Sequence, residues 1–248
     1  IFFWMLKVSL ITVCYNSSKT IYKTLESVKS QKFKNFEHII VDRKSTDNTL
    51  QICSKFSHIK KIISEKDNGV YDAFNKGIEC SEGDIIGFLN SDDVYYNSGS
   101  LDLIVQNFND NIDCVFGNLL YINYKGEVVR RWKSKTFKKG AFKKAWMPAH
   151  PTFYCRKEIY DKFGGYKTKY IIAGDFELML RFLERKRIRS KFIDKPIIRM
   201  LSGGLSNEGI ISKIKILKEE FEAFKENKMD VNKLFYIFHK AGKIREFF

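Results

Sequence analysis

The chain has few residues that could build covalent cross-links or a membrane span. Its 248 residues include five cysteines, which lie far apart and form no CxxC pair. An odd number of scattered cysteines argues against a disulfide framework and against a zinc site, and it is typical of a reducing compartment. No apolar run reaches the roughly 18 residues that a spanning helix needs. We therefore expect a cytoplasmic protein, with the inner face of the plasma membrane as a candidate peripheral location.

Two glycine-rich signatures of nucleotide-binding proteins are also missing. No GxGxxG follows the first apolar run, and GxxxxGK[ST] occurs nowhere in the chain. These absences argue against dinucleotide-dependent oxidoreductases and P-loop enzymes.

Acidic residues are scarce relative to basic ones. The chain has 29 Asp and Glu against 44 Lys and Arg, a formal net charge of +15. Nine basic residues and one acid fall between positions 125 and 144, where Trp132, Phe137 and Phe142 are interleaved. Residues 233–248 combine four bases, one acid and several aromatic residues. This composition suits an anionic membrane interface; a solvated basic face with a tail helix packed on the core is the alternative.

Strands and helices alternate along the first part of the chain. Apolar, β-branched runs predict strands at 8–13, 36–41, 59–64 and 85–89, and helical spacing predicts helices at 20–31, 45–56 and 70–78. Such alternation indicates a mostly parallel sheet. The second part is mixed, with strands expected at 113–118, 119–124, 128–132 and 188–193 and helices at 174–185 and 210–224. We predict one α/β domain over 1–207 with two abutting halves, about 7–93 and 94–207, and a helical tail at 208–248.

Polar residues follow three of the predicted strands. Thr12 to Asn16 ends the first, Asp42 ends the second, and Asp92 and Asp93 follow the fourth. Ligands of open α/β sheets bind at the carboxyl ends of the strands. Two adjacent acids there repel each other unless a cation offsets them, and divalent ions commonly join carboxylates to substrate phosphates. A metal–diphosphate site is one interpretation, and a helix cap formed by these acids is the other.

Five motifs in this order resemble the family-2 inverting glycosyltransferases of the GT-A fold. They are Thr12-Val13-Cys14-Tyr15-Asn16, Val41-Asp42 with Ser45-Thr46-Asp47-Asn48-Thr49, Asp67 to Gly77, Asn90-Ser91-Asp92-Asp93, and Gly174-Asp175-Phe176-Glu177-Leu178. His150-Pro151-Thr152-Phe153 and the segment from Arg199 to Asn207 are similar to the branch that makes bacterial surface polysaccharides. The resemblance covers about residues 7 to 207. It implies a GT-A fold of two abutting Rossmann-like halves around a mixed, mostly parallel central sheet.

The resemblance also implies a nucleotide-sugar donor, most simply a UDP-sugar. Tyr15 would flank the uracil and Asp42 would accept a hydrogen bond from its imide, with Thr12 and Asn16 beside them. Asp92 would lie by the ribose or the metal. Asp93 would ligate a Mn²⁺ or Mg²⁺ ion that bridges the diphosphate.

The remaining candidates belong to the reaction and to the acceptor. Asp175 would be the general base, in an apolar setting that raises the pKa of a carboxyl, with Glu177 as the second choice. The acceptor would be a saccharide or a polyprenyl-diphosphate-linked saccharide. His150 and Arg199 are possible donor or acceptor contacts, each with a purely structural alternative.

Asp67 and Asn75 are expected in the donor pocket, or else in an ordinary turn and on a polar helix face. Gly203-Gly204 suggest a lid. Arg43-Lys44 depart from the small residues usual after the second strand, which puts the loop shape and the donor in question.

Two other functions compete with this prediction. A nucleotidyltransferase that makes sugar nucleotides would carry a glycine-rich signature near the first strand, and this signature is missing here. A basic nucleic-acid-binding module would use the net charge, but RNP, KH and helix-turn-helix signatures are absent. We therefore expect no nucleic acid partner.

Overall fold

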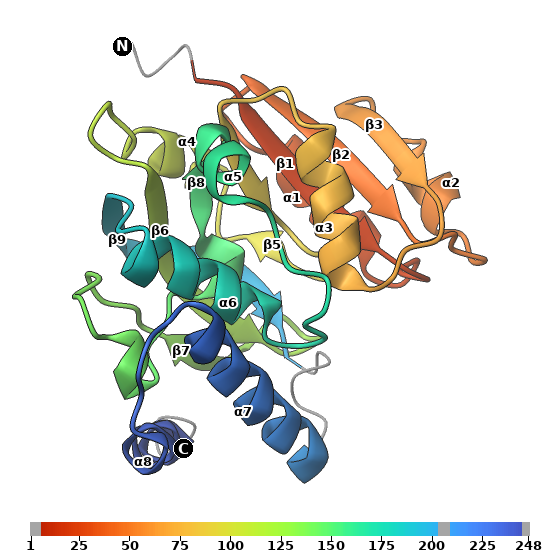
Figure 1. The fold of residues 1–248 in the computed structure, drawn as a ribbon. Helices are drawn as coiled ribbons and strands as arrows, with labels where there is room; N and C mark the ends of the chain where they lie inside the picture. The colour runs from red at the N-terminus through yellow and green to blue at the C-terminus, as the bar shows by residue number, and fades with distance from the viewer. Residues whose placement is uncertain (1–5, 203–208, 245–248) are drawn as a thin grey trace.

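The computed structural model describes residues 6–202 and 209–244. They form one twisted sheet with helices packed around it (Figure 1). The sheet order is β3-β2-β1-β4-β8-β6-β9-β5, and β7 pairs with β6 at the side. The strands are β1 (Val8–Cys14), β2 (Phe36–Asp42), β3 (Ile59–Ser64), β4 (Ile85–Phe88), β5 (Val94–Tyr95), β6 (Cys114–Ile122), β7 (Val128–Trp132), β8 (Tyr154–Arg156) and β9 (Ser190–Leu201). The helices are α1 (Ile21–Lys29), α2 (Thr49–Cys53), α3 (Val70–Glu79), α4 (Ser100–Val105), α5 (Lys157–Phe163), α6 (Gly174–Met179), α7 (Gly209–Glu226) and α8 (Lys233–Ile244). Two short 3₁₀ turns, η2 (Phe142–Lys144) and η3 (His150–Thr152), and a π-helical turn, η4 (Leu180–Arg185), complete them.

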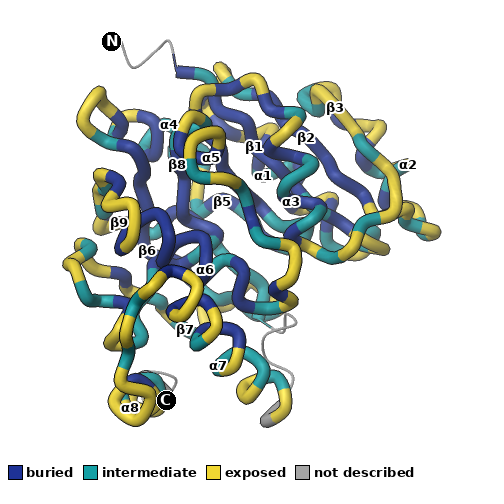
Figure 2. Tube along the Cα trace, viewed as in Figure 1, coloured by how far each residue is buried: buried dark blue, intermediate teal, exposed yellow. Residues whose placement is uncertain are grey.

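The first half forms the parallel sheet that the alternating pattern predicts. β1 pairs in parallel with both β2 and β4, and β2 pairs in parallel with β3. Successive side chains point to opposite faces of a strand. Ile11 accordingly packs with Phe74 of α3 on one face, whereas Leu10 packs with Val28 of α1 on the other. Figure 2 shows these central strands as the most deeply buried part of the chain.

The second half extends the sheet with mixed pairing. β8 runs antiparallel between β4 and β6, β6 pairs in parallel with β9, and β6 and β7 form a hairpin. The two strands predicted at 113–118 and 119–124 are one strand, β6, because nothing interrupts its buried run from Cys114 to Leu120. The strand predicted at 188–193 continues to Leu201, with a register shift opposite Pro196.

Some elements differ from prediction, either because they are too short to show a pattern or because side-chain hydrogen bonds form where a helix was expected. β5, α4, β8 and α5 were not predicted, and two to seven residues give too little periodicity to detect them. The helix expected at 45–56 is reduced to α2, because Ser45 and Asp47 bond to neighbouring loops instead of starting a helix.

The C-terminal helices pack on the same core. The rings of Phe224 in α7 and Tyr236 in α8 lie 5.5 and 6.5 Å from the ring of Phe176 in α6. The tail is therefore joined to the second half through buried aromatic contacts. Among the helices of the described ranges, none has the length and apolar composition needed to cross a bilayer. The predicted lid glycines, Gly203 and Gly204, lie outside the described residues.

Candidate active site

The loops that follow β1, β2 and β4 meet at one edge of the sheet. The backbone N–H of Asn16 donates to Ser45 Oγ at 2.8 Å, and the N–H of Thr46 donates to Asn16 Oδ1 at 2.9 Å. Ser91 Oγ donates to Ser17 Oγ at 2.9 Å, which ties the third loop to the first. The three polar clusters therefore converge, as their position after parallel strands predicts.

Asp42 lies at the centre of this edge but has no exposed surface. Its carboxylate accepts hydrogen bonds from the N–H and hydroxyl of Ser45, from Ser64 Oγ at 2.7 Å and from the Cys14 thiol at 3.6 Å. A uracil imide would reach this carboxylate only after one of these donors moved. In this conformation Asp42 fixes the loops rather than lining the surface.

Tyr15 is 55% exposed, and its ring carries a cation on one face. The Arg43 guanidinium carbon lies 5.6 Å from the centre of that ring, and Arg43 Nε lies 3.1 Å from Asp67 Oδ1. Lys44 takes the left-handed conformation, with φ of 55°. The loop thus keeps a tight turn without glycine, and Arg43 occupies a face on which a base could stack.

Asp93 has the surroundings expected of a metal ligand. It is fully buried, Asn90 Nδ2 donates to its Oδ2 at 3.2 Å, and its Oδ1 has no hydrogen-bond partner within the described part of the chain. Burial, followed by the charge of Asp92, raises the pKa of the Asp93 carboxyl well above its usual range. Burial also raises the pKa of Asp92. Both shifts arise because charge is unfavourable there without a counter-ion.

These two acids fit part of a divalent metal site. Within residues 6–202 and 209–244, no three His, Cys, Asp or Glu side chains form a group that could hold a metal ion. A Mg²⁺ or Mn²⁺ ion is commonly held by one or two carboxylates together with substrate phosphates. Asp93, with its unpaired oxygen, and Asp92 would supply the protein ligands.

A hairpin that the sequence did not place at the donor site lies beside Asp93. Asp93 precedes β5, which pairs with β9, and Met200 of β9 pairs with Tyr121 of β6. Arg130 of β7 pairs with Tyr121, and its guanidinium carbon lies 4.9 Å from the Tyr121 ring centre and 5.7 Å from that of Trp132. Burial raises the pKa of Tyr121, the Arg130 guanidinium opposes part of this rise, and the charges of Asp93 and Asp175 add to it. Asp93 and Asp175 therefore both lie near Tyr121 of this hairpin.

Asp175 lies in the first turn of α6, in aromatic surroundings. Burial raises the pKa of its carboxyl, and the nearby His150 opposes part of this rise. His150 Nε2 lies 3.2 Å from the Tyr166 hydroxyl, and burial lowers the pKa of the imidazole. A Cβ at Gly174 would lie 2.6 Å from the Tyr71 ring, so glycine is required for this approach.

Glu219 of α7 holds the segment that leads into Asp175. Its carboxylate accepts hydrogen bonds from the backbone N–H groups of Ile172 at 2.9 Å and Ala173 at 2.8 Å, and from that of Ile171 at 3.2 Å. Glu219 could not be recognised from the sequence, because it lies more than 40 positions after Asp175 and is one of several acids on a charged helix.

Four predicted site residues have structural partners instead of an open face. Thr12 is fully buried and its hydroxyl donates to the Leu89 carbonyl at 2.7 Å. Both ends of the Asn75 amide bond to the backbone of Tyr166 at 2.8 Å, which pins that loop to α3. The Arg199 guanidinium carbon lies 4.8 Å from the Tyr96 ring centre.

Glu177, the second choice for the base, is the fourth. It is fully buried, and it accepts hydrogen bonds from Arg181 Nε at 3.1 Å and Asn227 Nδ2 at 3.1 Å and pairs with Lys167 Nζ at 2.8 Å. In this structure the carboxylate is fully engaged inside the core, which favours Asp175 over Glu177 as the base. The i,i+4 spacing of Glu177 and Arg181 is the signal that could have revealed the ion pair.

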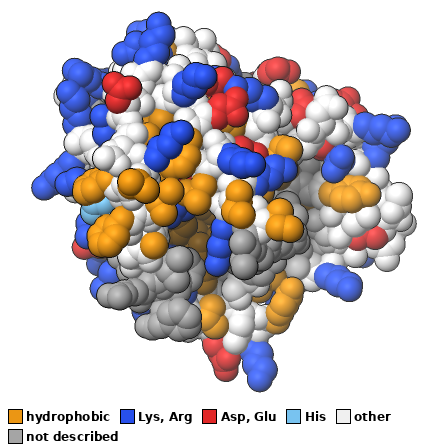
Figure 3. Space-filling model, turned by 60° about the horizontal axis from the view of Figure 1, so that its bottom comes forward, with side chains coloured by type: hydrophobic (Ala, Val, Ile, Leu, Met, Phe, Trp, Pro, Cys, Tyr) orange, Lys and Arg blue, Asp and Glu red, His pale blue; other side chains and the backbone are white. Residues whose placement is uncertain are grey.

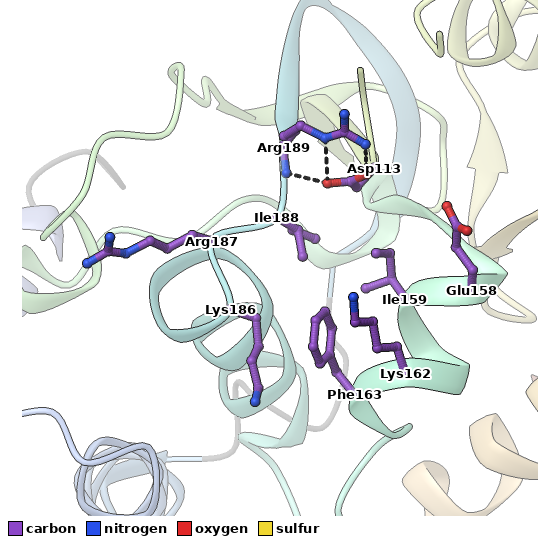
Figure 4. A pocket seen from close by; sticks show the side chains of 9 residues that line it. All are labelled: Asp113, Glu158, Ile159, Lys162, Phe163, Lys186, Arg187, Ile188 and Arg189. Carbon is purple, nitrogen blue, oxygen red and sulfur yellow. Dashed lines mark hydrogen bonds and ion pairs between the residues drawn. The ribbon is translucent and has the colours of Figure 1, made fainter. Parts of the chain in front are cut away.

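A groove of about 390 Å³ lies away from this site (Figure 4). It is lined by α5 and by the segment before β9, where the Arg189 guanidinium holds the Asp113 carboxylate at 2.6 Å. Asp113 immediately precedes β6, whereas Asp93 lies near the other end of β6 and β9. The groove is therefore separate from the acids described above.

The strand order and pairing define an α/β protein with a polar site at the carboxyl ends of its parallel strands. The model of the family described as "Glycosyl transferase family 2" matches residues 9–185, and the chain belongs to this family. Its catalytic activity is therefore glycosyl transfer, and the nucleotidyltransferase and nucleic-acid-binding alternatives are set aside.

Several relatives and solved structures are similar to the chain. A PGL/p-HBAD biosynthesis glycosyltransferase of Mycobacterium bovis is 24% identical over 208 residues, 80% of this chain and 78% of the relative. The Escherichia coli UDP-Glc:alpha-D-GlcNAc-diphosphoundecaprenol beta-1,3-glucosyltransferase WfaP is 43% identical over 91 residues, 36% of each chain. The structure of S. aureus TarS 1–349 in complex with UDP-GlcNAc superposes with a TM-score of 0.66 at 20% identity, covering 97% of this chain and 72% of that 1–349 chain. At that identity the likeness confirms the predicted GT-A fold.

Proposed function

We propose that the chain transfers a sugar from a UDP-sugar to a lipid-linked saccharide, with inversion and with the help of a divalent metal ion, in the synthesis of a bacterial surface polysaccharide. The observation that carries the proposal is a pair of acids near Tyr121 of β6: Asp93, which is fully buried beside the strand ends, and Asp175 in the first turn of α6. One of them has an unpaired oxygen at the sheet edge, and the other has a raised pKa beside His150.

Known proteins of similar fold support the finer parts of this proposal. TarS has been solved with UDP-GlcNAc, and the mannosyltransferase PcManGT of Pyrobaculum calidifontis with GDP-Man and Mn²⁺, the latter at a TM-score of 0.64 and 16% identity over 91% of this chain and 65% of that one. The name of WfaP gives a UDP-glucose donor and a diphosphoundecaprenol-linked acceptor. Because such an acceptor resides in a bilayer, the proposal includes work at the inner face of the plasma membrane.

In this proposal Asp93 and Asp92 hold the metal ion. A bound divalent ion would neutralise the charge that develops on the leaving diphosphate. Tyr15 flanks the uracil once Arg43 leaves its ring, and Asn16 and Asp67 support the loops around the base. Asp42 meets the imide if Ser45 or Ser64 yields its hydrogen bond.

Asp175 acts as the general base. Its carboxylate takes the proton of the acceptor hydroxyl as that oxygen bonds to the anomeric carbon from the face opposite the diphosphate. The bond between the anomeric carbon and the phosphate oxygen breaks, and UDP leaves. A base whose pKa is raised toward the working pH holds a proton more effectively during this step.

Calorimetric titration with UDP, GDP and dTDP, each with and without Mn²⁺, tests the donor site. We expect Mn²⁺-dependent binding of UDP, and we expect Asp93→Ala to abolish the metal dependence. Asp110→Ala is the matched control, because Asp110 is an exposed acid. Metal-independent binding, or equal binding by Asp93→Ala and the wild type, would remove Asp93 from the metal site.

A further inference from the structure

Helix α8 presents an apolar face to solvent. Leu234 is 80% exposed and Phe238 is 76% exposed, and Phe235 and Ile237 beside them are also exposed. Tyr236 alone among these neighbours is buried against the core. Residues three and four apart share one face of a helix, so Leu234 and Phe238 form the centre of this face.

Positive charge surrounds this apolar face. The sequence from Lys233 to Ile244 contains no acid. α8 packs against η2, where Lys143 and Lys144 are exposed. η2 belongs to the 125–144 stretch, with its nine basic residues and one acid. In the view from below, hydrophobic side chains gather with lysines and arginines between them (Figure 3).

The acids nearest to α8 offset only part of this charge, since Glu220 neutralises Lys240 and the exposed Asp230 lies three residues before the helix. Glu220 of α7 is buried and binds Lys240 of α8. Glu222, two residues further along α7, pairs with Lys169 at 2.6 Å. The face that remains for a partner is therefore apolar and cationic.

We propose that this face of α8 docks on an anionic phospholipid bilayer, with Leu234 and Phe238 inserted among the acyl chains and the lysines of η2 on the headgroups. Apolar side chains flanked by lysines are the composition that binds an anionic interface. A second copy of the chain fits less well, because a self-complementary contact would bring the same lysines of both copies together. This proposal rests on the proposed function in one respect, the use of the surface to reach a lipid-linked acceptor.

The test is co-sedimentation of the full chain with vesicles of phosphatidylglycerol and phosphatidylcholine, compared with phosphatidylcholine alone. We expect binding to the anionic vesicles that weakens with salt. Leu234→Ser combined with Phe238→Ser should weaken it about tenfold or more, since each exposed side chain loses the apolar area it would insert. Lys143→Gln with Lys144→Gln should weaken it and reduce its salt dependence.

Ile62→Ser is the matched control, because Ile62 is 40% exposed on β3, the far edge strand of the sheet. Equal binding by the wild type and the α8 variant, or no binding by either, would overturn the proposal. A dimer in sedimentation that the α8 variant loses, without vesicle binding, would assign the face to a second copy instead. None of these measurements uses a nucleotide, so failure here is distinguishable from failure of the UDP titration.

Discussion

Glu219→Gln is the change that tests most directly how the fold positions the proposed base. The carboxylate of Glu219 accepts backbone hydrogen bonds from residues 171, 172 and 173, immediately before Gly174 and Asp175. A glutamine of the same shape keeps one acceptor oxygen and presents an N–H₂ donor in place of the other. That donor faces N–H groups that have lost their acceptor.

The size of the effect follows from these bonds. Hydrogen bonds to a charged group contribute about 1.5–3 kcal/mol, and a buried donor left unpaired costs about 1–3 kcal/mol. We therefore expect Glu219→Gln to lower the free energy of unfolding by about 2–3 kcal/mol. Glu222→Gln is the matched control one turn away, where Glu222 and Lys169 are 53% and 44% exposed. Exposed ion pairs contribute roughly 0–1 kcal/mol, so that variant should stay close to the wild type.

Urea unfolding measures the free energy, and hydrogen–deuterium exchange of the peptide containing Ile171 to Ala173 measures the loop itself. We expect faster exchange of that peptide in Glu219→Gln and unchanged exchange in Glu222→Gln. UDP binding should persist in both variants, because the loops that follow β1, β2 and β4 are not altered. Equal exchange and equal stability in the two variants would refute the positioning role of Glu219.

Three further predictions concern the base, acid stability and the donor loop. Asp175→Asn should abolish transfer, measured as UDP release with a polyprenyl-diphosphate-linked acceptor, while UDP binding measured by calorimetry is retained. The wild-type rate should rise with pH as the Asp175 carboxyl, whose pKa is raised by burial, loses its proton. Loss of both transfer and binding would contradict the assignment. Burial lowers the pKa of His38 from 6.5 to about 3, so its contribution to stability is complete above pH 6.5 and falls as the pH drops toward 3. The fall is about 1.4 kcal/mol per pH unit, and His38→Gln should show a flatter acid limb in urea unfolding at several pH values; an unchanged limb would exclude His38 as its source. Arg43→Ala should tighten UDP binding about threefold to tenfold, because the base then need not displace a cation from Tyr15 and Asp67, and weaker binding would mean that the guanidinium contacts the diphosphate.

The sequence was sufficient for the first half of the fold. β1, β2 and β4 are mostly apolar and almost wholly buried, and α1 and α3 bury one regular face each, so local pattern and tertiary burial agree. It was insufficient for β5 and β8, which have two and three residues and exist only because β9, β4 and β6 offer them hydrogen bonds. Such strands have no pattern of their own.

The same distinction applies to the site. The convergence of the three polar loops could be predicted, since parallel strands end at one edge. The hydrogen bonds that engage Asp42 and Asn75 could not, because they come from Ser64 and Tyr166, which lie elsewhere in the chain. A polar residue in a recognisable motif can therefore hold the loops of a site in place without facing the ligand.

The C-terminal helices connect the two proposals physically. α7 carries Glu219, which holds the segment before Asp175, and the adjacent Glu220, which binds Lys240 of α8. The buried Tyr236 fastens α8 to the core, and the outward face of α8 carries Leu234 and Phe238. One unit thus orders the proposed catalytic loop on its inner side and presents an apolar, cationic surface on its outer side. An enzyme whose acceptor is anchored in a bilayer needs its catalytic loop held at a fixed distance from its membrane-binding surface. Packing the loop and the surface on the same pair of helices keeps them in that position.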